Sequence, residues 1–128
     1  MKTKEILLVE DEPAVAHDLT QRLEGFGYRI HGPEGTGEAA LKKVGTTSVD
    51  LVLMDISLAG EWDGIETAQK LVEVQDLPIV YLASDTDEET LQRAILTQPS
   101  GYLEKPVRNR ELYSTCLLYT SPSPRDEL

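Results

Sequence analysis

The chain has 128 residues, of which 40% are hydrophobic and 27% charged, and its formal net charge is −11. This length suits one domain with one core, and no apolar run approaches the ~20 residues that a membrane span needs. The acidic balance argues against nucleic-acid binding, because phosphate backbones are held by clustered lysine and arginine. A single cysteine, Cys116, excludes an internal disulfide, and no Cys/His cluster has the spacing of a zinc site.

The amino-terminal third alternates strand-like and helix-like segments. The apolar run EILLV at 5–9 predicts a strand buried on both faces, and it leads straight into acidic residues. A helix is predicted over 13–27, because Pro13 suits a first helical turn, apolar residues follow at helical spacing and glycines close the segment. A short strand at 28–32 and a short helix at 37–44 come next.

The rest of the chain repeats this alternation. The predicted elements are a strand at 50–55, a helix at 65–74, a strand at 77–83, a helix at 86–98, a strand at 101–106 and a helix from 107. Thr86 and Glu89 have the spacing of a capping box. Strands that alternate with helices through right-handed crossovers predict an α/β fold: a doubly wound five-stranded parallel sheet, with helices on both faces. We predict the flavodoxin-like order 2-1-3-4-5, which makes strands one and three neighbours.

In such a sheet, ligands bind beyond the carboxyl ends of the strands. The residues there are Glu10 and Asp11 after the first strand, Asp55 after the third, Ala83 and Ser84 after the fourth and Lys105 after the fifth. Carboxylates this close repel unless a cation lies among them, and their oxygens suit Mg²⁺. The central Asp55 is then placed to attack a phosphoryl group, whose charge Mg²⁺ and Lys105 would neutralise.

Four stretches, LLVEDE, DLVLMDISLAGEWDGIE, LPIVYLASDTDEETLQRA and GYLEKP, together resemble the receiver domain of bacterial and archaeal response regulators, the CheY-like family. The resemblance extends from Lys4 to about Tyr113. It implies a phosphoacceptor at Asp55, a direct Mg²⁺ ligand at Asp11, an outer ligand through water at Glu10, a ligand at the backbone carbonyl of Ser57 and a phosphoryl charge partner at Lys105. It also implies that Tyr102 reorients on activation, and the Lys105–Pro106 bond can be cis.

The same resemblance implies a signalling switch of a two-component system rather than a metabolic enzyme. The phosphoryl group would come from a sensor histidine kinase or a phosphotransfer protein, and the domain would catalyse its own phosphotransfer and dephosphorylation. An output partner would bind the face of helix four, strand five and helix five, while a homodimer is left open. No nucleic acid or membrane partner is expected, and the lack of a signal peptide at the start favours the cytoplasm.

One position departs from the family pattern. Ala83 stands where the family carries a threonine or serine whose hydroxyl binds a phosphoryl oxygen, and Ser84 matches the small residue that follows. Because side chains alternate along a strand, Ser84 does not simply take over that contact. In a second interpretation, a one-residue slip in the loop brings the Ser84 hydroxyl inward to the position of the missing one. The missing hydrogen bond to a charged group is worth ~1.5–3 kcal/mol.

Two other functions stay open. A degenerate receiver, which binds partners without full phospho-switching, is favoured by Ala83. A phosphohydrolase with an aspartate nucleophile, of the haloacid-dehalogenase type, would need a second acid two residues after Asp55, where this chain has Ser57.

The end of the chain does not match what precedes it. After Tyr119 come Ser-Pro repeats, which cannot continue a helix. The run 116–126 resembles the translation of a sequencing adapter. We therefore predict a receiver domain at 1–115 and a non-native tail at 116–128 that replaces the end of helix five.

Overall fold

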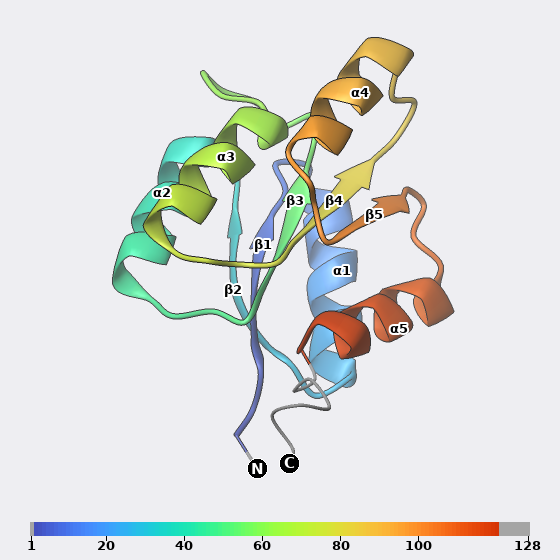
Figure 1. Cartoon of the computed structure of the whole chain (residues 1–128). Coiled ribbons are helices and arrows are strands. Elements are labelled where there is room, and N and C mark those ends of the chain that lie inside the picture. The colour runs from blue at the N-terminus through green and yellow to red at the C-terminus, as the bar shows by residue number, and fades with distance from the viewer. Residues whose placement is uncertain (1, 121–128) are drawn as a thin grey trace, which may run out of the picture.

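The computed structural model describes residues 2–120, whose elements follow the predicted alternation of strands and helices (Figure 1). In chain order they are β1 (Glu5–Val9), α1 (Pro13–Gly25), β2 (Arg29–Glu34), α2 (Gly37–Thr46), β3 (Leu51–Asp55), α3 (Gly64–Val74), β4 (Ile79–Ala83), α4 (Glu88–Leu96), β5 (Gly101–Glu104) and α5 (Asn109–Thr120). Neighbouring strands are parallel, in the order β2-β1-β3-β4-β5. The predicted α/β fold and its strand order are confirmed.

Helices lie on both faces of the sheet (Figure 1). The strands supply side chains to two apolar clusters, one on each face. Along β3, Val52 and Met54 pack on the side of α2, α3 and α4. Leu51 and Leu53, which alternate with them, pack on the side of α1 and α5. Because helices cover both faces, a central strand has no solvent side, and this is why its sequence is an unbroken apolar run. The first polar side chain of β3 is therefore Asp55, at the carboxyl edge of the sheet.

Side-chain carboxylates cap the amino-terminal ends of α3 and α4. Asp63 caps α3 in a reciprocal capping box with Glu66, where each side chain accepts a hydrogen bond from the other residue's backbone N–H. Asp87 caps α4, whose first turn donates a backbone N–H to it. The predicted capping box of Thr86 and Glu89 is therefore wrong. Asp87 is one residue closer to the helix, and its negative charge interacts favourably with the amino-terminal end of the helix dipole.

The last described helix, α5, runs to Thr120 and buries Cys116 in the cluster that it shares with α1. The Tyr28 hydroxyl lies 3.0 Å from the Thr120 hydroxyl, which joins the end of α5 to the start of β2. The boundary predicted after residue 115 stays a prediction, and 121–128 lie outside the described residues. Within 2–120, none of the helices has the length and apolar character needed to cross a membrane.

Candidate functional site

Three carboxylates meet at the carboxyl edge of the sheet. Glu10, Asp11 and Asp55 each offer one oxygen, and these oxygens all lie within 4.8 Å of one another. β1 and β3 are adjacent, and Val9 pairs with Met54. The next residues along the chain, Glu10 and Asp55, therefore also lie close to each other. Glu10 and Asp55 are buried, with 2% and 3% of their surface exposed, while Asp11 is partly exposed. We call these three residues the acid cluster.

Lys105 brings a positive charge to the acid cluster from the end of β5. Its Nζ lies 2.8 Å from Glu10 Oε1 and 3.5 Å from Asp55 Oδ1. Although burial lowers the pKa of Lys105, its hydrogen bond to Glu10 and the charge of Asp55 raise it above its ordinary value. The ammonium is therefore charged at neutral pH. The Lys105–Pro106 peptide bond is cis, as the sequence allows.

The positive charge near Asp55 does not balance the negative charge of the acid cluster. Burial, together with the neighbouring Glu10 carboxylate, raises the pKa of Asp55 to about 7, and Lys105 and the Ser57 N–H oppose this only in part. Three carboxylates thus share one ammonium. Their hard oxygen donors, one of them partly open to solvent, suit a small divalent cation such as Mg²⁺, which would supply the missing charge. The residues present therefore fit this metal.

The loop between β3 and α3 is tied to the acid cluster by backbone donors. The Ser57 N–H donates to Asp55 Oδ1 at 3.0 Å, and the Ala59 N–H donates to Asp11 Oδ2, also at 3.0 Å. On the other side, the Glu12 N–H donates to Glu10 Oε2 at 3.2 Å. These bonds orient all three carboxylates without using their full capacity as acceptors.

Gly64 is a contributor that the sequence analysis did not single out. It begins α3, and its N–H donates to the Ile56 carbonyl at 2.9 Å. A Cβ on Gly64 would lie 2.0 Å from the Asp55 carbonyl oxygen, so only glycine lets α3 start this close to the strand end. The sequence signal was the Asp63–Gly64 step before an apolar helical pattern, which marks a turn or a close backbone approach.

Ala83 and Ser84, the departure from the family pattern, differ in their surroundings. Ala83 ends β4 with 1% of its surface exposed, in the apolar cluster beneath α2, α3 and α4. Ser84 is exposed, and Asp85 after it has a positive φ of 51°. Tyr102 on β5 is half-buried and packs against the same cluster as Ala83. The methyl of Ala83 and the ring of Tyr102 therefore belong to one packed unit.

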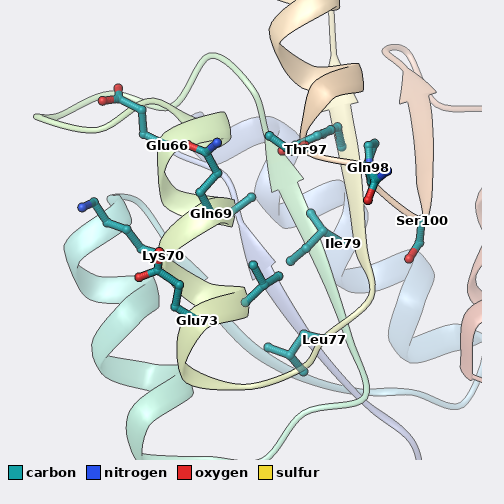
Figure 2. Close-up of a pocket in the computed structure, with 13 residues that line it drawn as sticks. Glu66, Gln69, Lys70, Glu73, Leu77, Ile79, Thr97, Gln98 and Ser100 are labelled. Atoms are coloured by element: carbon teal, nitrogen blue, oxygen red, sulfur yellow. The ribbon is translucent and has the colours of Figure 1, made fainter.

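A hollow on the other side of α3 lies apart from the acid cluster. It has a volume of about 580 Å³ and lies between α3 and the turn from α4 to β5 (Figure 2). In Figure 2, Gln69 of α3 faces Thr97 and Gln98 across it, with Leu77 and Ile79 at its base. Neither Lys105 nor any acid-cluster residue lines it. This hollow is therefore separate from the acid cluster.

Comparisons with known proteins agree with this geometry. The family described as "Response regulator receiver domain" matches residues 6–116. The chain is 38% identical over 110 residues to the positive alginate biosynthesis regulatory protein of Pseudomonas aeruginosa, covering 84% of this chain and 43% of that protein. It is 32% identical over 109 residues to the transcriptional regulatory protein PdtaR of Mycobacterium tuberculosis, covering 85% and 53%.

Among solved structures, the signal receiver domain of a modulated diguanylate cyclase from Desulfovibrio desulfuricans superimposes with a TM-score of 0.88 at 37% identity, covering 93% of this chain and 94% of that one. The chain thus spans about half the length of the curated relatives it matches, but nearly the whole of a solved receiver domain. With its fold, its acid cluster and this family match, the chain belongs to the response regulator receiver domain family.

Proposed function

We propose that this domain accepts a phosphoryl group on Asp55 from a phosphohistidine of a sensor histidine kinase or phosphotransfer protein. The observation that carries the proposal is the meeting of the acid cluster with Lys105 at the strand ends. Three carboxylates and a lysine from β1, β3 and β5 would be an unfavourable arrangement without a function that uses their charge.

Each group has a distinct part in the proposed transfer. An oxygen of Asp55 attacks phosphorus, the phosphorus–nitrogen bond breaks, and the imidazole leaves with the electron pair and takes up a proton. Asp11 and Asp55 would hold Mg²⁺ directly, the Ser57 backbone carbonyl would be a third ligand and Glu10 would act through water. When bound, Mg²⁺ supplies positive charge to the phosphoryl oxygens. Lys105, already 3.5 Å from Asp55, neutralises a further oxygen.

Dephosphorylation at the same site would return the switch to its resting state. A water oxygen attacks phosphorus, the bond to the Asp55 oxygen breaks, and inorganic phosphate leaves. The domain would catalyse this step itself, which makes it a switch rather than a metabolic enzyme. The phosphohydrolase alternative is not favoured, since the position two residues after Asp55 is the exposed Ser57, which is no general acid.

The proposed output face is formed by α4, β5 and α5. It is supported by large apolar side chains left exposed on both helices: Ile95 and Leu96 on α4, and Tyr113 on α5. Such residues can bury surface against an output partner or a second copy of the domain. We place this exchange in the cytoplasm, where soluble signalling partners would meet it.

Removal of metal tests the proposed function directly. We expect the protein to take up label from acetyl phosphate with Mg²⁺ present, and to lose at least ~100-fold in initial rate with excess chelator, because the acid cluster then keeps its uncompensated charge. The measurement is incorporation of labelled phosphoryl per folded protein. Equal rates with and without Mg²⁺ would contradict the proposed site. Continuous turnover of a generic phosphate ester would instead indicate the phosphohydrolase.

The Ala83→Thr variant tests whether the missing hydroxyl limits switching. A hydrogen bond to a charged group is worth ~1.5–3 kcal/mol, so the variant should bind beryllofluoride, a phosphoryl mimic, with Mg²⁺ about tenfold more tightly than the native protein. We also expect a larger amide shift at Tyr102 in NMR titrations. Ala83→Val, of nearly the same shape but without the hydroxyl, is the control. If the two variants behave alike, the hydroxyl has no part in switching, and a Tyr102 resonance silent in both would favour the degenerate receiver.

A further inference from the structure

An arginine on α1 reaches the loop that carries Lys105. Arg22 Nη1 donates to the Val107 carbonyl at 2.8 Å, across 85 positions in the sequence. Its Nη2 donates to Asp18 Oδ2, also at 2.8 Å, one helical turn earlier on α1. The neighbouring Leu19 and Leu23 are fully buried, so the helix that presents Arg22 is firmly packed. The guanidinium therefore joins a rigid helix to a loop two residues beyond Lys105.

Other contacts also hold this loop. Lys105 is anchored before the loop by its N–H, which donates to the Ala83 carbonyl at 2.7 Å. Beyond that bond, the segment from Lys105 to Val107 borders a hollow of about 260 Å³, which Arg22 also lines. Pro106 is exposed. The Val107 side chain is buried in the apolar cluster shared with α1, and the Arg22 bond adds a second hold on this residue through its backbone carbonyl.

The contact is costly for Arg22 itself. Its Nε is buried and has no hydrogen-bond partner among the described residues. A buried unpaired donor lowers stability. The hydrogen bonds of Arg22 therefore come from its two Nη atoms, one to Asp18 and one to the Val107 carbonyl. The same loop places the Lys105 ammonium within 3.5 Å of Asp55.

We propose that Arg22 is a positioning residue for phosphoryl transfer: by holding the Val107 carbonyl, it fixes the loop that aims Lys105 at Asp55. The inference rests on the proposed function of Asp55 and Lys105. Asp18 orients the guanidinium and contributes to the same effect through Arg22. Arg22 touches neither the phosphoryl group nor the acid cluster, and acts only through the backbone.

The experiment compares Arg22→Met, which keeps an unbranched apolar stem but no donors, with Arg22→Lys and Asp18→Asn. We expect Arg22→Met to lower the initial rate of labelling by acetyl phosphate by about tenfold, because small misplacements of a catalytic group are costly. Arg22→Lys and Asp18→Asn should fall between this variant and the native protein. Arg108→Met is the control: it removes the same charge from an exposed side chain of the same loop and should label at the native rate.

A double-mutant cycle with Lys105→Ala separates positioning from stability. The Lys105→Ala variant has no ammonium for the loop to position. Adding Arg22→Met to Lys105→Ala should therefore change neither the labelling rate nor the NMR-measured affinity for beryllofluoride with Mg²⁺. Effects that multiply would overturn the proposal, as would native rates in folded Arg22→Met. If Arg22→Met does not fold, the cycle is run with Arg22→Lys. Failure of the native protein itself to label would instead reject the proposed function.

Discussion

An Asp55→Asn variant is expected to take up no label from acetyl phosphate under conditions in which the native protein is labelled. The amide cannot act as the anionic nucleophile, and no other described carboxylate of the site stands in the same position between Lys105 and the Ser57 N–H. The fold should persist, because the substitution removes one of three crowded negative charges from a buried site. Thermal unfolding should therefore show unchanged or increased stability.

Asp85→Asn is the matched control for this experiment. It makes the same chemical change at an exposed position just beyond β4, where φ is 51°, a value that asparagine tolerates well. We expect native labelling from this variant. If Asp55→Asn and the native protein label equally, Asp55 is not the phosphoacceptor, and the proposed function has to be abandoned.

A Gly64→Ala variant is expected to lose about 3 kcal/mol or more of unfolding free energy. The added Cβ would lie 2.0 Å from the Asp55 carbonyl oxygen and 2.8 Å from the Ile56 Cα. Both are backbone atoms at the end of a buried central strand, so relief requires moving either the start of α3 or the strand that carries Asp55. Denaturant unfolding measures the loss, and any folded protein should also label more slowly because Asp55 is displaced.

Gly45→Ala provides the comparison for this stability prediction. Gly45 lies near the end of α2, and an added Cβ meets nothing within 4 Å. Alanine is the better helix former, so this variant should be unchanged or more stable by up to ~1 kcal/mol. Similar losses in both variants would show that the close approach at Gly64 does not constrain the fold.

We expect Ala83 and Arg22 to affect the same proposed site. In the proposed transfer, Ala83 would leave the phosphoryl group one hydroxyl donor short of the family pattern, and Lys105 would carry a larger share of its charge. The position of Lys105 would then matter more, and with it the bond from Arg22 to the Val107 carbonyl. The Ala83→Thr and Arg22→Met variants should therefore be combined: a restored hydroxyl would reduce the effect of a displaced Lys105.

The chain's local patterns determined the element types, the sheet and the identity of the acid cluster. Periodicity is a property of neighbouring residues, and burial on both faces leaves an unbroken apolar run such as LVLM before Asp55. The approach of Glu10 and Asp11 to Asp55 followed from parallel strands whose carboxyl ends share one edge. The cap of α4 was misplaced, because two adjacent residues, Thr86 and Asp87, both suit the position.

Only the tertiary structure decided how those residues interact. The 2.8 Å contact of Lys105 with Glu10, and the raised pKa of Asp55, depend on how far each side chain is buried and which charge lies nearest. The bond from Arg22 to Val107 joins residues 85 positions apart, and no local pattern encodes it. The closeness of Gly64 to the Asp55 carbonyl likewise depends on where α3 meets β3. Sequence periodicity specifies which face of an element is buried, whereas distances between elements depend on the packing of the whole core.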